Sequence, residues 1–176
     1  MQEVILVTEE DVEVGRCEKM FAHEHGFLHR AFSIFLFNSS GEILLHKRAM
    51  VKYHSGGLWT NACCSHPEPD VPIELSLQER LQFEMGITCP LTHAFSFVYR
   101  AELDHDMIEH EFDHVYVGVT DTRPDPNPKE VSEWQYFGIS ELMQLVEIHP
   151  EQFTAWFKIA LPKVVQQVEK MNLWVA

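Results

Sequence analysis

The residues most able to do chemistry lie in one segment, Trp59-Thr60-Asn61-Ala62-Cys63-Cys64-Ser65-His66-Pro67, where a thiol stands two residues from an imidazole. Side chains alternate along an extended strand, so Cys64 and His66 are predicted to face one cavity. Cys63 and Ser65 are then predicted to face away from it. This pattern suits a reactive cysteine beside a metal. The alternative is a core strand with a buried cysteine and a hydrogen-bonded histidine.

Two other segments carry further candidate metal ligands. His23, His25 and His29 occur within seven residues. Gly26 lies among them, which favours a loop over 19–29 rather than a helix. Loops often present ligands, so this cluster is a candidate binding segment.

Two carboxylates, Glu109 and Glu111, alternate onto one face of a predicted strand. Burying such a pair is costly unless the groups are solvated, bind a metal or share a proton. A solvated strand at the edge of the sheet is the alternative to a functional site.

Five side chains from these segments form a candidate transition-metal site: His23, His29, His66, Glu109 and Glu111. Three nitrogens and two oxygens suit Mn²⁺, Zn²⁺ or Fe²⁺, with a sixth position open to water or substrate. The set contains no local metal motif such as HExxH, so its convergence depends on the fold.

The charge balance excludes several classes of partner. The 176 residues carry 13 Lys and Arg against 27 Asp and Glu, a net charge of −14 at pH 7. This charge opposes binding to nucleic acid or to an anionic membrane. Lys47, Arg48 and Lys52 are nevertheless clustered just before the thiol segment, which suits a small anion.

Length and cysteine usage predict one domain, residues 1–176, with a core that needs no disulfides. The four cysteines, at 17, 63, 64 and 89, are predicted to be reduced because a vicinal pair is a poor disulfide framework. The first residues show no leader pattern, and no stretch has the length of a membrane span. We therefore expect a cytoplasmic protein.

Hydrophobic patterns predict strands over 3–8, 13–17, 31–38, 42–46, 94–101, 107–120 and 133–137. Three hairpins are expected, over 3–17, 31–46 and 94–120. Helices are predicted over 72–85, after Ser140 as N-cap, and from Pro150 onward with a kink or restart near Pro162.

The helix over 72–85 has the clearest pattern. Asp70 is its predicted N-cap and Gly86 its predicted end. Every fourth residue forms an apolar stripe: Leu77, Leu81 and Met85. Arg80 and Glu84 share the neighbouring stripe, and a surface ion pair is one interpretation of them.

Several separated motifs, in their order, resemble those of type I isopentenyl-diphosphate Δ-isomerase: Glu18-Lys19-Met20, Ala22-His23, Leu28-His29-Arg30-Ala31-Phe32-Ser33, Trp59-Thr60-Asn61, Cys64-Ser65-His66-Pro67, Phe83-Glu84-Met85-Gly86-Ile87, Tyr99-Arg100-Ala101 and Glu109-His110-Glu111. The resemblance covers nearly the whole chain. It implies an α/β (α+β) fold, a Nudix-like α/β/α sandwich with a mixed, mostly antiparallel sheet.

A pyrophosphate-cleaving Nudix enzyme is the alternative, and its box is GX5EX7REUXEEXGU. Aligning Gly86-Ile87 with the final GU places Glu79-Arg80 at RE and Phe83-Glu84 at EE. Val71 then stands at the earlier glutamate position, so Glu84 alone of these box carboxylates remains. Losing carboxylates weakens metal-assisted attack of water on phosphorus, which favours the isomerase.

The resemblance implies a role for each catalytic residue. Cys64 and Glu111 form the pair that moves a terminal C=C inward, and Tyr99 holds or relays a proton. Glu111 is expected on the proton-donor side and Cys64 on the opposite face of the substrate. Trp156 is expected to stabilise a carbocation-like intermediate by a cation–π contact, with core packing as the alternative.

The resemblance also implies the binding groups, with a small-molecule diphosphate as partner and a monomer or weak homodimer as the assembly. Glu84 would hold Mg²⁺ against the diphosphate. The cations expected to grip the diphosphate are Lys19, Arg48, Lys52 and Arg80. The transition metal would be held by His23, His29, His66, Glu109 and Glu111.

Three positions depart from the pattern or leave it ambiguous. His110 stands where the family often has Asn, and alternation turns it away from the metal. His25 could replace His23 as a ligand. Cys63 is expected to face the core.

Overall fold

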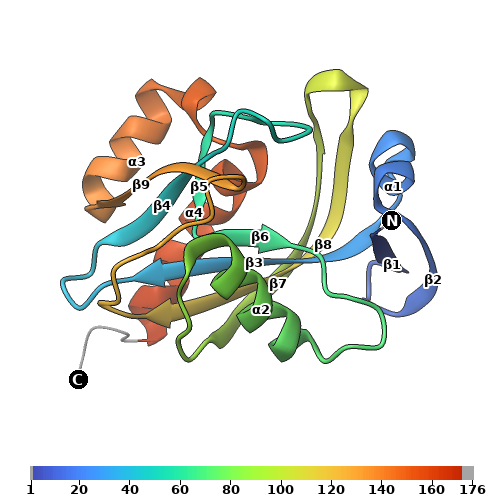
Figure 1. Ribbon diagram of the computed structural model, residues 1–176, viewed down its shortest axis with the longest axis horizontal. Helices are drawn as coiled ribbons and strands as arrows, with labels where there is room; N and C mark the ends of the chain where they lie inside the picture. Colours follow the sequence, from blue (N-terminus) through green and yellow to red (C-terminus); the bar gives the residue numbers. More distant parts are fainter. Residues whose placement is uncertain (1, 172–176) are drawn as a thin grey trace.

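Within residues 2–171, which the computed structural model describes, nine strands form one mixed sheet with helices on both faces (Figure 1). The strands are β1 (Glu3–Val7), β2 (Glu13–Glu18), β3 (His29–Phe37), β4 (Ile43–Arg48), β5 (Trp59–Asn61), β6 (Cys63–Ser65), β7 (Thr92–Glu102), β8 (Ile108–Val119) and β9 (Val131–Phe137). The helices are α1 (Lys19–His25), α2 (Ile73–Met85), α3 (Ile139–Ile148) and α4 (Ala155–Met171), with 3₁₀ turns at Asp104–Asp106 and Pro150–Gln152.

Strand β3 is the centre of the sheet. It pairs with β1, β4 and β6 in antiparallel fashion and with β8 in parallel. The β3–β8 ladder runs from His29↔Glu111 to Phe37↔Val119, and β6 pairs with the other edge of β3 through Ser33. This topology confirms the predicted mixed, mostly antiparallel sheet.

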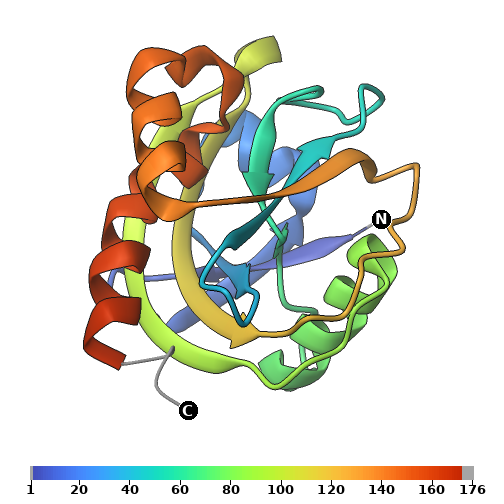
Figure 2. The ribbon, with the colours of Figure 1, turned by 90° about the vertical axis from the view of Figure 1, so that its left-hand side faces the viewer.

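The two faces of the sheet carry separate cores, and β3 contributes to both. Phe35 and Phe37 pack with α3 and α4. Ile34 and Leu36 pack with α2 on the other face. Figure 2 shows α2 and α4 on opposite sides of the sheet. A strand covered on both faces carries a continuous apolar run rather than an alternating one, as β3 does over 34–37.

The segment 59–65 bridges an opening between β3 and β4. Among the described residues, these two strands pair only at Leu36↔Leu44 and Phe37↔Ile43. Beyond that point β4 pairs with β5 and β9, and β3 pairs with β6. The hairpin predicted over 31–46 therefore exists only near its turn, because the rest of β4 finds other backbone partners.

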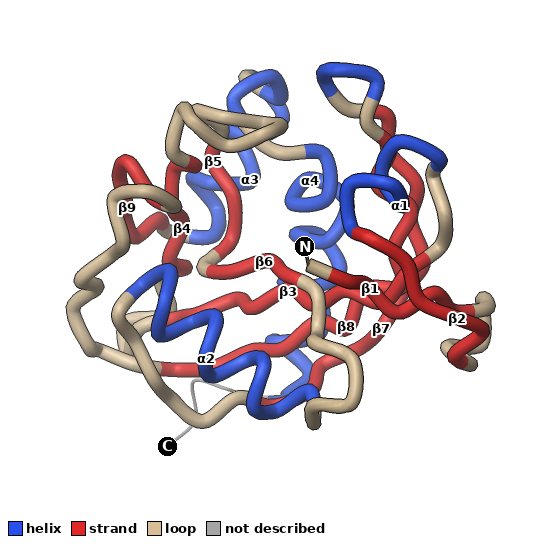
Figure 3. Tube along the Cα trace, turned by 45° about the vertical axis from the view of Figure 1, so that its right-hand side comes forward, coloured by secondary structure: helices blue, strands red, loops and turns tan. Residues whose placement is uncertain are grey.

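Residues 19–25 form helix α1, so the prediction of a loop over 19–29 is wrong for this part. The Glu18 side chain accepts the backbone N–H of Phe21 at 2.9 Å, which caps the helix. Gly26 ends it at φ 64°. The glycine therefore ends a helix in which His23 is buried and His25 is exposed to solvent. Figure 3 shows α1 beside β1 and β2.

Both predicted N-caps are wrong. Helix α2 begins after Pro72 with no side-chain cap within the described residues. Asp70 instead accepts two hydrogen bonds from Arg16, at 2.6 and 2.7 Å, because a guanidinium offers a bidentate partner. Helix α3 begins at Ile139, so Gly138 rather than Ser140 holds the N-cap position.

Helix α4 continues through Pro162, so the predicted restart there does not occur. Phe157 on one side of the proline and Val164 on the other are both fully buried against the sheet. This packing supports the helix on both sides of the proline, which lacks an N–H. None of the described helices is long and apolar enough to cross a membrane.

The C-terminal end of α2 is a tightly constrained point. The predicted stripe is buried, namely Leu77, Leu81 and Met85. Gly86 ends the helix at φ 68°, and a Cβ added there would lie 2.5 Å from the carbonyl oxygen of Asp125. The glycine is required both by its backbone conformation and by this close approach.

We expect Gly86→Ala to lower the free energy of unfolding by about 2–4 kcal/mol, since both the left-handed backbone and the clash oppose a Cβ. Urea denaturation measures the change. Gly138→Ala is the matched control, because a Cβ there meets nothing within 4 Å. Equal stabilities of the two variants would contradict the constraint at Gly86.

Candidate active site

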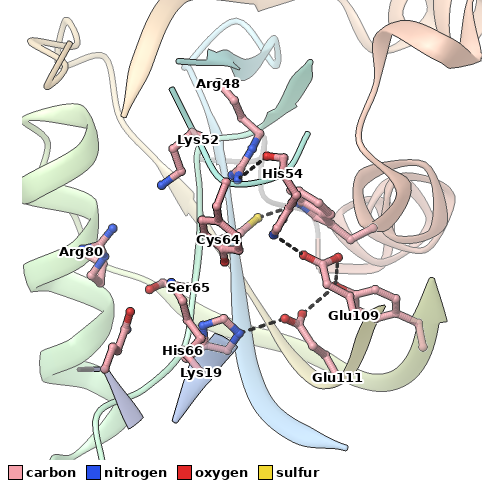
Figure 4. Close-up of a pocket in the computed structure, with 14 residues that line it drawn as sticks. Lys19, Arg48, Lys52, His54, Cys64, Ser65, His66, Arg80, Glu109 and Glu111 are labelled. Atoms are coloured by element: carbon pink, nitrogen blue, oxygen red, sulfur yellow. Dashed lines mark hydrogen bonds and ion pairs between the residues drawn. The ribbon is translucent and has the colours of Figure 1, made fainter. Parts of the chain in front are cut away.

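One cavity is lined by most of the predicted site residues, where the β3–β8 ladder begins (Figure 4). Its walls come from elements far apart in the chain, including α1, α2, α4 and four strands. The side chains that line it include Lys19, Arg48, Lys52, Tyr53, His54, Cys64, Ser65, His66, Arg80, Tyr99, Glu109, Glu111 and Trp156.

Four of the five predicted metal ligands converge at one side of this cavity. The ligand atoms of all four lie within 4.8 Å of one another, on His23, His29, His66 and Glu111. Glu111 Oε1 lies 3.0 Å from His66 Nε2 and 3.5 Å from His29 Nε2. The ladder explains the placement, because His29 pairs directly with Glu111.

Backbone carbonyls orient two of these imidazoles. His23 Nδ1 donates to the carbonyl oxygen of Lys19 at 2.8 Å, and His29 Nδ1 donates to that of Phe27 at 2.7 Å. Because a carbonyl only accepts, Nδ1 carries the proton and Nε2 presents a lone pair. His23 Nε2 is buried without a hydrogen-bond partner among the described residues. Burial lowers the pKa of His23, and lowers that of His66 to about 3, so both rings are neutral as metal ligands must be.

Glu109 belongs to a second group of donors that shares His23, so the five-ligand site stays a prediction. Its Oε1 lies 3.6 Å from Nε2 of His54, and the ligand atoms of His23, His54 and Glu109 form a second group within 4.8 Å. Two residues along a strand span about 7 Å, so Glu109 and Glu111 reach different neighbours. Both carboxylates are buried, which excludes the solvated edge strand.

Tyr99 lies between the two carboxylates. Its hydroxyl is 2.6 Å from Glu111 Oε2 and 3.0 Å from Glu109 Oε2. Burial, and then the charge of Glu111, raise the pKa of Glu109 well above its ordinary value. Burial alone would also raise the pKa of Glu111, but the neighbouring imidazoles of His29 and His66 hold it well below its ordinary value. The proton therefore resides on Glu109 and the charge on Glu111.

Cys64 faces the same cavity from β6, on the opposite edge of β3 from Glu111. Its S–H donates to Asn61 Oδ1 at 2.9 Å, and the indole N–H of Trp156 donates to its sulfur at 3.0 Å. Burial, and then the nearby charge of Asp113, raise the pKa of Cys64 above its ordinary value. The thiol is therefore protonated and fixed in direction.

A serine and a carboxyl group that the sequence analysis did not single out lie beside this thiol. Ser33 Oγ donates to Asp113 Oδ2 at 2.8 Å and lies 3.6 Å from the sulfur of Cys64. Asp113 is 1% exposed, and its Oδ1 has no hydrogen-bond partner within the described part of the chain. Burial, and then the charge of Glu111, raise the pKa of Asp113 to about 8. The alternation that identified Glu109 and Glu111 extends to Asp113 and could have found it.

Trp156 both packs in the core and faces the cavity, so its two interpretations are compatible. It is 3% exposed and belongs to the core under α4. The guanidinium of Arg48 lies 5.2 Å from its ring centre, and the ring of His54 meets it edge-on at 5.8 Å. The ring is therefore rigidly placed beside the sulfur of Cys64.

The four cations predicted to bind diphosphate all line the cavity, namely Lys19, Arg48, Lys52 and Arg80. Burial lowers the pKa of Lys19 to about 8, and repulsion from Lys52 and Arg80 adds to the effect. Lys47 is not part of this group, because it lies 3.8 Å from Glu133 instead. Cations crowded in this way attract an anion.

Glu84 is buried rather than exposed, so its pair with Arg80 is not a surface ion pair. Arg80 also lies 4.0 Å from Glu130, which accepts a hydrogen bond from Lys52. Glu130 was not among the predicted residues. Two carboxylates and two cations thus form one network beside the cavity.

The remaining predictions have mixed outcomes. Cys63 is buried in the α2 core, as predicted. Ser65 was predicted to face away, yet it lines the cavity because β6 is only three residues long and turns after it. His110 points away and donates to the carbonyl oxygen of Gly26 at 3.0 Å. His25 lies outside both metal-ligand groups found among the described residues.

Comparison with known proteins places this site in a family. The sequence matches the NUDIX domain model over residues 27–157. The isopentenyl-diphosphate Delta-isomerase of Pectobacterium atrosepticum is 49% identical, with 93% of this chain and 92% of that protein covered. Isopentenyl-diphosphate Delta-isomerase 1 of Aromatoleum aromaticum is 46% identical, with 99% of this chain and 98% of that protein covered. The chain belongs to the isopentenyl-diphosphate Delta-isomerase family.

Solved structures confirm the Nudix fold of this isopentenyl-diphosphate Delta-isomerase family member. A protein from Deinococcus radiodurans superimposes with a TM-score of 0.77 at 17% identity, covering 92% of this chain and 98% of that chain. A Nudix hydrolase from M. smegmatis superimposes with a TM-score of 0.60 at 14% identity, covering 98% and 97%. At such identities the likeness shows the fold alone.

We expect Asp113→Asn to stabilise the metal-free isomerase increasingly as pH rises from 5 to 8. In the unfolded chain an aspartate ionises near pH 4, whereas Asp113 in the folded protein keeps its proton up to about pH 8. The folded state binds more protons in this window, so stability falls as pH rises, by up to about 1 kcal/mol per pH unit, and the asparagine removes this loss.

Urea denaturation at pH 5, 6, 7 and 8 measures the gain in unfolding free energy over the parent protein. Asp106→Asn, at an exposed position, is the matched control. A gain for Asp113→Asn that is the same at pH 5 and pH 8 would contradict the prediction.

Proposed function

We propose that this protein interconverts isopentenyl diphosphate and dimethylallyl diphosphate by adding one proton to the carbon skeleton and removing another. One observation carries the proposal. The Cys64 thiol and the Tyr99–Glu111 pair face one cavity from strands on the two edges of β3. Groups placed in this way can act on different faces of one small substrate.

His23, His29, His66 and Glu111 would hold a divalent transition metal, with Glu109 beside them. The donor set fits such an ion because burial lowers the pKa of His23 and of His66, and because His23 Nε2 is buried with no hydrogen-bond partner among the described residues. Mn²⁺, Zn²⁺ and Fe²⁺ all accept this mixture of nitrogen and oxygen donors. When bound, the ion supplies positive charge that stabilises the buried carboxylates and tunes their acidity.

The diphosphate group would lie among the cations that line the other side of the cavity. Lys19, Lys52 and Arg80 repel one another there, and an anion relieves that repulsion. Glu84, beside Arg80, would hold Mg²⁺ against the phosphate oxygens. This arrangement fixes the polar end of the substrate and leaves its carbon skeleton near Cys64.

Proton transfer would proceed in two linked steps. In one direction, the carboxyl of Glu111 donates its proton, directly or through Tyr99, to the terminal carbon, and the electrons of the C=C form the new C–H bond. The resulting tertiary cation then loses a proton from the neighbouring CH₂ to the sulfur of Cys64, and those electrons form the internal C=C. The thiolate and the carboxylic acid thus become a thiol and a carboxylate.

The charge state of the free protein is the one expected after these two proton transfers. The pKa of Cys64 is raised by burial, and the neighbouring imidazoles of His29 and His66 outweigh burial to keep the pKa of Glu111 low. The thiol therefore holds the proton while the carboxylate is charged. From this state the same two groups run the reverse reaction, with Cys64 as donor and Glu111 as acceptor.

The ring of Trp156 would face the tertiary cation. It is fixed by the hydrogen bond from its N–H to the sulfur of Cys64 and by its burial between α4 and the sheet. A rigid indole face stabilises a cation, and its apolar surroundings keep water from adding to it.

Hydrolysis of the diphosphate is disfavoured because most carboxylates of the hydrolase box are missing from this chain. Glu84 is the one glutamate retained from the aligned hydrolase box, and it accepts a hydrogen bond from Arg80. A single carboxylate can hold an ion but offers little help to an attacking water.

The proposal is tested by incubating the protein with isopentenyl diphosphate, Mg²⁺ and Mn²⁺ in D₂O and following products by NMR. Dimethylallyl diphosphate that carries deuterium is the expected product. Released phosphate without an allylic product would indicate a hydrolase and overturn the proposal. No turnover would overturn it as well.

We expect Cys64→Ala to lower kcat by about 100-fold or more, because it removes one of the two proton-transfer groups. Cys63→Ala is the matched control, since that neighbouring thiol is buried in the α2 core and does not line the cavity. Initial rates of dimethylallyl diphosphate formation measure both. Full activity of Cys64→Ala would contradict the role of its thiol.

A further inference from the structure

One lysine of the cavity has no carboxylate partner. Lys52 pairs with Glu130, and Arg80 pairs with Glu84. Lys19 lines the same cavity but makes no ion pair with a carboxylate among the described residues. Its ammonium group therefore depends on another kind of contact for its position.

That contact is with the ring of Tyr53, a residue of the cavity wall that the roles above do not use. Lys19 Nζ lies over this ring, 4.6 Å from its centre. An ammonium group within about 6 Å of an aromatic ring centre is attracted by the negative face of the ring, and the attraction is stronger where water is excluded. Lys19 is half-buried, so the ring of Tyr53 holds its charged end by a cation–π contact.

Two neighbouring cations act against this position of Lys19. The charges of Lys52 and Arg80 repel its ammonium group, which stands at the end of a flexible four-carbon stem. The ring of Tyr53 opposes this repulsion without adding negative charge to the cavity. A carboxylate in place of the ring would also attract the lysine, but it would repel an incoming anion.

The ring of Tyr53 is itself placed by contacts made before any ligand binds. It lies in the loop between β4 and β5, and the backbone N–H of Ser55 in this loop donates to both carboxylate oxygens of Asp104, at 3.0 and 3.3 Å. Asp104 belongs to the turn between β7 and β8. The Tyr53 ring also packs against the ring of His54, with the two centres 4.3 Å apart. Distant parts of the chain therefore fix the ring beneath Lys19.

We propose that Tyr53 is a positioning residue for diphosphate binding, and that its ring holds the ammonium group of Lys19 in the cavity before the substrate arrives. The inference rests on the diphosphate subsite of the proposed function. The Tyr53 hydroxyl makes no hydrogen bond to another residue within 2–171, so the ring carries the role. Because the lysine is already ordered, the anion binds without the entropy cost of fixing that side chain.

Binding of inorganic pyrophosphate to the full-length, metal-loaded protein, measured by calorimetry with Mg²⁺ present, tests this role without using catalysis. We expect Tyr53→Leu to raise Kd by about 3- to 10-fold, the effect of having to order one long side chain. Tyr53→Phe keeps the ring and should bind within about twofold of the parent protein. Phe21→Leu, at an exposed position of α1 outside the cavity, is the matched control.

A double-mutant cycle with Lys19→Met separates this role from general packing. If the ring acts through the ammonium group, Tyr53→Leu should weaken pyrophosphate binding no further in the Lys19→Met background. In the isomerase assay, Tyr53→Leu should raise KM for isopentenyl diphosphate and leave kcat within about twofold, because the ring affects binding alone.

A second measurement needs no variant and covers the case in which Tyr53→Leu folds poorly. In the parent protein, the ring current of Tyr53 should shift the NMR signals of the Lys19 Hε protons upfield, because the end of this side chain lies over the ring. Lys19 Hε signals at the ordinary position for lysine would overturn the contact.

Three results with pyrophosphate would each overturn the role of the ring: unchanged affinity in Tyr53→Leu, an equal loss in Tyr53→Phe, or a full loss in the Lys19→Met background. If the variants behaved as expected but the parent protein formed no deuterated dimethylallyl diphosphate, the proposed function alone would fail. If that product formed and Tyr53→Leu bound pyrophosphate as the parent protein does, the positioning role alone would fail.

Discussion

The parallel pairing of β3 with β8 is the constraint on which the site depends. It fixes His29 beside Glu111, so that one register sets an imidazole and a carboxylate 3.5 Å apart. The other edge of β3 pairs with β6, which carries Cys64 and leads into His66. A shift of β8 by one residue would turn its carboxylates to the opposite face. The ladder therefore positions the metal ligands and the proton-transfer pair together.

The cavity that results has two differently charged sides. Glu109, Glu111 and the imidazoles lie on one side, whereas Lys52 and Arg80 lie on the side of α2, paired with Glu130 and Glu84. Each group lowers the stability of the folded protein when no ligand is bound, as the lowered pKa of Lys19 and the unpaired nitrogen of His23 indicate. A metal at one wall and a diphosphate at the other compensate both sets. The same unfavourable groups that lower the stability of the ligand-free protein therefore strengthen its binding of a metal and a diphosphate.

Sequence alone located the short-range patterns of this site. Alternation paired Cys64 with His66 and Glu109 with Glu111, because period two is a local property of a strand. Alternation could not identify His54, because this residue lies in a glycine-containing loop and lines the cavity only through long-range packing. Gly26 was ambiguous because a glycine is common both within loops and at the ends of helices. The single domain, the cytoplasmic location and the monomer or weak homodimer stay predictions.

We infer that the β3–β8 register creates a metal site that leaves the thiol free. Anomalous diffraction at the manganese edge from Mn²⁺-loaded crystals locates the ion. We expect a peak about 2.0–2.3 Å from His29 Nε2, His66 Nε2 and Glu111 Oε1, with no metal on the sulfur of Cys64. A peak on Cys64, or no peak among these three donors, would contradict it.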